Sequence, residues 1–182
     1  MIFDNRNNVL YVADGNTIGA IDQQNNVTTY LPLGRLSGFN EITDIDIAPG
    51  TIGGTLYFTT KENDLCKIEP DGNAIKLTKT ADRIYGGNET GPLNSADHFD
   101  GAYGVATGKD GEIYFFNTAW NTMHGVTLSA TDPAAGMVSP FTGKPVAARG
   151  GNAWPFYDGQ GEQALMAAQY LILPLMAMAI FM

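Results

Sequence analysis

The side chains in this chain that are best suited to chemistry are carboxylates in two short segments. Asp44 and Asp46 alternate with isoleucines, so both carboxylates lie on one face of an expected strand. Oxygen ligands of this kind suit Ca²⁺. The candidate metal ligands, expected near the mouth of a central channel, are Asp44, Asp46, Asp97, His98 and Asp100. The sequence has no dense Asp-x-Asp-x-Asp-Gly loop, so solvated strand faces are the alternative interpretation.

Nucleophilic catalysis has little support in the sequence. A Ser/His/Asp or Cys/His arrangement needs a base within hydrogen-bond reach of the nucleophile, and the only histidines are His98 and His124. The single cysteine, Cys66, lies in an expected strand and is interpreted as a small core side chain. We therefore predict no catalytic residues, and the sequence favours a protein that is not an enzyme.

Aromatic side chains in Gly-rich segments are the candidates for binding, because aromatic rings stack on sugars or anchor a protein partner. Packing of the same rings over a sheet edge is the alternative interpretation. The candidate binding residues are Trp120, Asn121, Trp154, Phe156 and Tyr157.

The charge of the chain disfavours nucleic acid as a partner. The formal net charge is −9 over 182 residues, and the ten Lys and Arg residues form no run. Such a surface repels a phosphate backbone. A protein or a glycan is the expected partner, and no cofactor is expected unless the acidic residues bind Ca²⁺.

The elements that must position these side chains are short strands, because one motif occurs three times. Its copies span residues 10–18, 56–65 and 113–123, and each joins an aliphatic-Tyr-apolar strand to a polar turn that contains Asn. Short alternating strands and Asn/Asp/Gly turns flank every copy. We expect Asn16, Asn63 and Asn121 to hold the turns, because Asn tolerates the left-handed conformation and bonds its own loop.

The spacing of the copies predicts an all-β protein of the β-propeller class. Four-stranded propeller blades repeat at roughly 40–50 residues, and the second interval is lengthened by a Gly/Asn/Asp-rich insertion at 86–97. The expected blades are residues 1–37, 38–85 and 98–147, with a fourth begun at 150. The fold class is therefore an incomplete propeller within residues 1–163.

The motif resembles the NHL repeat, in its bacterial form. The residues that match that repeat are Asp4, Asn8, 10–14, Asn16, Ile18 and Ile21 in the first copy, and 104–106, Asp110, Gly111, 113–115 and Asn121 in the third. The resemblance implies a ring of about six blades. The family often has Arg after the turn Asn, but this chain has Thr17, Asp64 and Thr122, which disfavours the RNA binding of some members.

Two expectations concern the ends of the chain. The first copy begins late and the fourth is cut short, so we expect a fragment of a longer gene product. Residues 164–182 are almost wholly apolar, interrupted by Pro174, and are interpreted as a truncated or out-of-frame end or as a membrane anchor. An extracellular or cell-surface location with a missing signal is expected, and a cytoplasmic one stays open.

Two functions remain open at this stage. The first is a non-catalytic binding scaffold whose propeller-face loops contact a protein or a glycan. The second is a Ca²⁺-dependent propeller hydrolase or lyase, similar to lactonase-like relatives, that uses the acidic residues at the channel mouth. The fold by itself cannot choose between them, because propellers host many functions.

Overall fold

The structure is a computed structural model, and its description covers residues 1–31, 41–49, 54–62, 64–78, 90–93, 102–108, 111–117, 122–132 and 135–142. All regular secondary structure in these ranges is β-strand. No helix within them has the length and apolar character needed to cross a bilayer. The fourth repeat and the apolar tail lie outside the described residues.

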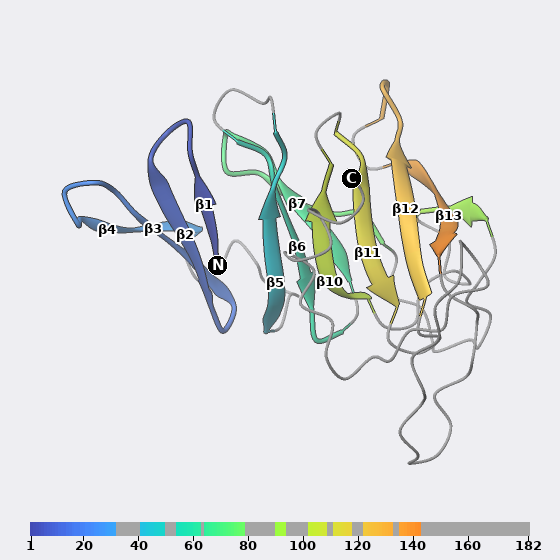
Figure 1. Cartoon of the computed structure of the whole chain (residues 1–182), viewed down its shortest axis with the longest axis horizontal. Coiled ribbons are helices and arrows are strands. Elements are labelled where there is room, and N and C mark those ends of the chain that lie inside the picture. The colour runs from blue at the N-terminus through green and yellow to red at the C-terminus, as the bar shows by residue number, and fades with distance from the viewer. Residues whose placement is uncertain are drawn as a thin grey trace, which may run out of the picture.

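The strands form three antiparallel sheets, and four strands of each sheet form a meander in chain order (Figure 1). The first sheet contains β1 (Ile2–Asp4), β2 (Val9–Asp14), β3 (Thr17–Ile21) and β4 (Val27–Leu31). The second contains β5 (Ile42–Ile47), β6 (Leu56–Thr60), β7 (Leu65–Ile68) and β8 (Ala74–Lys76). The third contains β10 (Ala102–Thr107), β11 (Ile113–Asn117), β12 (Thr122–Leu128) and β13 (Gly136–Thr142).

A short additional strand covers the outer edge of the third sheet. β9 (Gly91–Pro92) precedes this sheet in the chain and pairs antiparallel with β13. The backbone N–H of Leu93 continues the pairing by donating to the Gly136 carbonyl oxygen at 2.8 Å. An exposed strand edge is a template for pairing with other chains, and β9 covers the first three residues of the β13 edge.

The three copies of the Tyr motif occupy the same place in each sheet. Tyr11, Tyr57 and Tyr114 lie on the second strand, opposite Ile2, Asp46 and Ala106 of the first strand. The three sheets can therefore be compared position by position.

The turn of the first motif differs from its prediction. Asn16 was expected to hold the left-handed position, but that conformation belongs to Gly15, with φ of 60°. Glycine has no Cβ to clash there, so it takes the position without cost from a side chain. Asn63 and Asn121, the equivalent residues in the other copies, lie outside the described residues.

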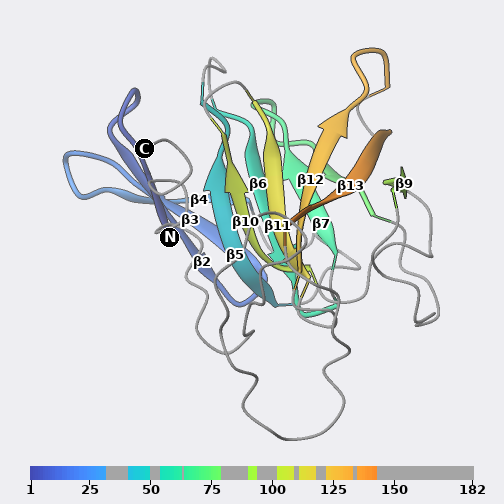
Figure 2. The same cartoon turned by 45° about the vertical axis from the view of Figure 1, so that its right-hand side comes forward.

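The sheets stack face to face, with β5 next to the first sheet and β10 next to β5 and β6 (Figures 1 and 2). Side chains alternate between the two faces of a strand, so each sheet supplies one face to each neighbour. The layer between the first and second sheets is formed by Tyr11, Ile18, Ala20, Ile42, Ile45, Leu56, Phe58, Cys66 and Ile68. The layer between the second and third is formed by Ala48, Tyr57, Leu65, Leu77, Leu93, Val105, Ile113, Phe115, Val126 and Val138.

Three successive four-stranded meanders, stacked with the first strands of adjacent sheets as neighbours, are consecutive blades of a β-propeller. The fold class predicted from the repeats is confirmed: the described chain is an incomplete propeller.

Cys66 lies wholly inside the layer between the first two blades. Burial raises the pKa of its thiol well above the usual value, and the nearby Asp64 carboxylate acts in the same direction. A thiol held protonated is a poor nucleophile. This residue packs as a small apolar side chain, as the sequence indicated.

Phe58 fills the centre of the layer between the first two blades, and its side chain has no exposed surface. We expect Phe58→Ala to lower the free energy of unfolding by about 3–5 kcal/mol, because a cavity replaces the ring. Gln23→Ala is the control, since Gln23 is exposed in a turn of the first blade. It should change stability by less than about 0.5 kcal/mol. Urea denaturation of both variants measures the difference, and equal effects would contradict the stacked arrangement.

Candidate functional site

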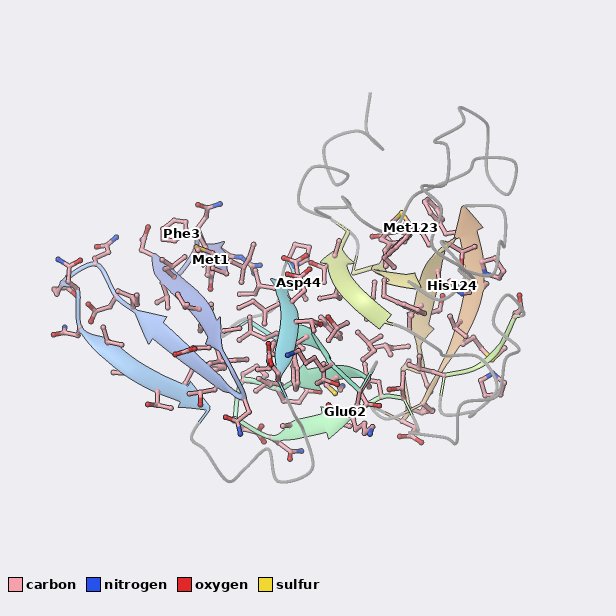
Figure 3. All side chains as sticks on the ribbon, turned by 90° about the horizontal axis from the view of Figure 1, so that it is seen from below. Met1, Phe3, Asp44, Glu62, Met123 and His124 are labelled. Atoms are coloured by element: carbon pink, nitrogen blue, oxygen red, sulfur yellow. The ribbon has the colours of Figure 1, made fainter. Side chains whose placement is uncertain are left out.

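Asp44 and Asp46 lie on β5, the first strand of the second blade. Figure 3 shows Asp44 between the first sheet and β10. Both side chains point toward β10 of the third blade, which the polar contacts of their carboxylates show. The prediction that the two carboxylates share one face of a strand is therefore confirmed.

Each carboxylate bonds two strands at once. One oxygen of Asp44 accepts from the N–H of Ile45 at 3.0 Å, and the other accepts from the N–H of Val105 on β10 at 3.1 Å. Asp46 repeats the pattern with Ile47 at 2.9 Å and Thr107 at 2.6 Å. The two carboxylates thus form a regular ladder from β5 to β10.

Thr107 adds a side-chain contribution to this ladder. Its hydroxyl lies 3.0 Å from Asp46 Oδ2 and 2.8 Å from the carbonyl oxygen of Ile47. A hydroxyl can donate one hydrogen bond at a time, so one of these two oxygens accepts it. The junction between the second and third blades therefore combines backbone, carboxylate and hydroxyl groups.

The ladder supplies hydrogen-bond acceptors for the backbone N–H groups on the inner edge strands of two blades. β5 and β10 are each the edge strand of their sheet, and an edge strand carries N–H groups that no neighbouring strand accepts. A buried N–H without a partner costs about 1–3 kcal/mol. Asp44 and Asp46 accept these N–H groups on both strands. We call the four residues Asp44, Asp46, Val105 and Thr107 the carboxylate ladder.

Burial raises the pKa of both carboxyl groups, and the backbone N–H groups that they accept act in the opposite direction. The interpretation of Asp44 and Asp46 as freely solvated side chains is therefore wrong, because both are half-buried between two blades. Their oxygens are engaged by protein N–H groups, which compete with any metal ion for the same lone pairs.

The structure describes only part of the candidate site. The remaining expected metal ligands, Asp97, His98 and Asp100, lie outside the described residues, as do the binding candidates Trp120, Asn121, Trp154, Phe156 and Tyr157. Within the described ranges, no three or more His, Cys, Asp or Glu side chains gather in a way that could hold a metal ion. The roles assigned to these residues stay predictions.

His124 has a larger structural role than its sequence context suggests. It lies on β12 with no exposed surface, and its ring stacks on Phe115 with centroids 5.2 Å apart. Its Nε2 is 2.9 Å from the hydroxyl of Thr122. The alternation of side chains places it on the same face as Phe115, toward the second blade. His124 is therefore part of the packing between blades.

A buried polar cluster near the start of β7 was also not predicted from the sequence. Asp64 is 2% exposed, forms an ion pair with Lys76 and accepts from the hydroxyl of Thr78 at 3.2 Å. The same Thr78 oxygen accepts from the N–H of Leu65 at 3.0 Å. These contacts join β7 to the residues that follow β8, and the only sequence signal is a polar residue at a strand end.

The comparisons with known proteins add no assignment of activity. No protein-family model and no curated protein matches the chain. Among solved structures it resembles selenomethionine-substituted virginiamycin B lyase from Staphylococcus aureus, with a TM-score of 0.42 and 15% identity. The match covers 77% of this chain and 43% of the lyase chain, so this chain spans less than half of that protein. The propeller assignment rests on the three stacked sheets.

Asp46→Ala tests the structural role of the ladder. It removes the acceptor of the Ile47 and Thr107 N–H groups, and we expect a loss of about 1–3 kcal/mol in the free energy of unfolding. Asp22→Ala is the control, because Asp22 also accepts two backbone N–H groups but does so in solvent-exposed hydrogen bonds at a turn. Chemical denaturation should show a clearly smaller effect for the control. Equal effects would mean that the ladder contributes nothing beyond an ordinary turn.

The pH dependence of stability provides a second test. A pKa raised by folding means that the folded chain binds the proton more tightly than the unfolded chain. The contribution of Asp44 and Asp46 is therefore greatest below the ordinary Asp pKa of about 4 and falls as pH rises through the raised pKa values. We expect the stability of the parent, relative to the double variant Asp44→Asn/Asp46→Asn, to fall as pH rises above the ordinary Asp pKa of about 4, because folding raises both pKa values. Urea midpoints measure this difference, and a constant difference would contradict the raised pKa values.

Proposed function

We propose that this chain is a non-catalytic binding module, an NHL-like propeller of the bacterial type whose face loops contact a protein or a glycan. The observation that supports the proposal is that Asp44 and Asp46 hold two blades together. These were the best-placed acidic residues for a metal-dependent reaction, and their oxygens accept four backbone N–H groups across the junction of two blades.

The geometry of the blades supports loops as the binding elements. The broad faces of the second blade pack against its neighbours on both sides, which leaves its edges and turns for recognition. Loops on a rigid scaffold commonly carry function. Trp120 and Asn121 fall between the end of β11 at Asn117 and the start of β12 at Thr122.

The chemistry of the candidate loop residues suits a glycan or a protein surface. An indole ring stacks on the apolar face of a sugar, and Trp is enriched among residues that dominate protein interfaces. The formal charge of −9 makes an anionic polymer a poor partner. An extracellular or cell-surface location fits such a role and is part of the proposal.

Trp120→Ala tests the binding surface, with Trp120→Phe as the control that retains an aromatic ring. The labelled chain is applied to a printed glycan array and to a panel of purified cell-surface proteins, and the strongest hit is titrated. We expect Trp120→Ala to weaken that hit at least about tenfold, as for interface residues that dominate binding. Trp120→Phe should stay within about threefold of the parent. Undiminished binding by the alanine variant would remove Trp120 from the proposed surface.

The metal-dependent hydrolase or lyase and the binding scaffold predict different effects of metal ions on the thermal midpoint. A ligand that binds only the folded chain raises its thermal midpoint. Under the proposed scaffold role, saturating Ca²⁺ or Zn²⁺ should leave the midpoint unchanged. An increase that disappears in Asp44→Asn/Asp46→Asn would instead favour the hydrolase or lyase and overturn the binding role.

A further inference from the structure

The side of the first sheet that faces away from the second blade is apolar and exposed in the described structure. Met1 is 79% exposed, Phe3 47% and Val27 72%. Figure 3 shows Met1 and Phe3 on this first sheet. Leu10 and Val12 on β2 alternate with Tyr11, which faces the second blade, so they lie on the same outer side. We call this side of the first sheet the open aliphatic face.

The same repeat positions form the interfaces inside the chain. Because Tyr11 is equivalent to Tyr57, Leu10 and Val12 correspond to Leu56 and Phe58 of the second blade. Leu56 and Phe58 are wholly buried against the first blade. The corresponding positions of the third blade are Ile113 and Phe115, which are buried against the second blade.

The surface that covers such a face is also the same in both interfaces. The first blade supplies Tyr11, which is 4% exposed, and the second supplies Tyr57, which is 7% exposed. Each Tyr lies in the apolar layer shared with the following blade. An aliphatic face of one blade therefore receives the Tyr-bearing side of the preceding blade.

The third blade carries a Tyr-bearing side of its own. Tyr114 is half-buried and packs against Phe141 with the two rings tilted and their centroids 4.8 Å apart. Phe141 is 40% exposed and Met137 on the same strand is 48% exposed, whereas Phe116 and Met123 are buried. The exposed part of this side is therefore the strip formed by Tyr114, Met137 and Phe141, which we call the aromatic strip.

We propose that the open aliphatic face docks the aromatic strip of a second copy of this chain, so that two copies associate head to tail. The apolar character of each surface matches that of the two layers already present between blades of the chain. Heterologous contacts of this kind produce a closed ring when the rotation closes. Two copies bring together six described blades, and closed propellers have about four to eight. The inference rests on the blade interfaces and is independent of the proposed binding role.

The mass of the purified chain in solution tests the association. Light scattering coupled to size-exclusion chromatography should give twice the chain mass of 19.5 kDa. Phe3→Glu on the open aliphatic face and Phe141→Glu on the aromatic strip should each reduce this to the single-chain mass. Gln23→Glu adds the same charge to an exposed turn of the first blade and should leave the pair intact. Both phenylalanines are substantially exposed, and unchanged far-ultraviolet circular dichroism confirms that the variants remain folded.

Mixing the two disrupted variants distinguishes head-to-tail from face-to-face association. The Phe3→Glu chain retains a native aromatic strip and the Phe141→Glu chain retains a native open aliphatic face. One native junction can therefore form between them, and an equimolar mixture should recover the double mass that neither variant shows alone. A symmetric contact between two aliphatic faces predicts no recovery.

Several results would overturn the proposal. They are a single-chain mass in the parent, a pair that survives Phe3→Glu, an assembly larger than a pair, and a mixture without recovery. A single-chain mass would point to another occupant of the open aliphatic face, such as a preceding blade in a longer polypeptide. None of these outcomes bears on binding through Trp120, so failure here is separable from failure of the proposed function.

Discussion

The interaction on which the junction of the second and third blades depends is the acceptance of edge N–H groups by two aspartates. Stacked sheets bury their faces easily, because apolar side chains need no defined partner. The first strands are harder to accommodate, since each brings unpaired N–H groups close to its neighbour. Asp44 and Asp46 satisfy β5 with one oxygen and β10 with the other. The spacing of two residues between them matches the spacing of Val105 and Thr107, so the ladder also sets the register between the blades.

The junction of the first and second blades satisfies its polar groups differently. The N–H of Ile42 donates to the Gly15 carbonyl oxygen at 2.7 Å, and the Arg6 guanidinium donates to the Ala48 carbonyl oxygen at 3.1 Å. Ile2 occupies the position equivalent to Asp46 and packs against the apolar layer. The repeat therefore specifies the apolar layers of each blade, whereas the polar contacts between blades are particular to each junction.

This distinction explains what could be predicted from the sequence. The strands and their order follow from hydrophobic alternation and from turn residues, both of which are local, and the repetition of the motif predicts the propeller. The shared face of Asp44 and Asp46 was predicted for the same reason. Their partners were not, because Val105 and Thr107 lie 61 positions away and contribute backbone N–H groups that no sequence pattern marks. The packing role of His124 could not be predicted either, because it depends on Phe115 of the neighbouring strand β11, which stacks on its ring.

The same reasoning separates the parts of the chain that hold the fold from those available for recognition. A blade with neighbours on both sides uses both faces for packing, as the second blade does, and its buried polar groups serve the strand ends and inner edges. In a repeat protein each unit is stabilised mainly by its nearest neighbours. The first blade has the same face chemistry as the second but exposes Phe3 and Val27. An apolar face with this pattern matches the faces that pack between blades, whereas a ligand surface would require polar groups to orient its ligand.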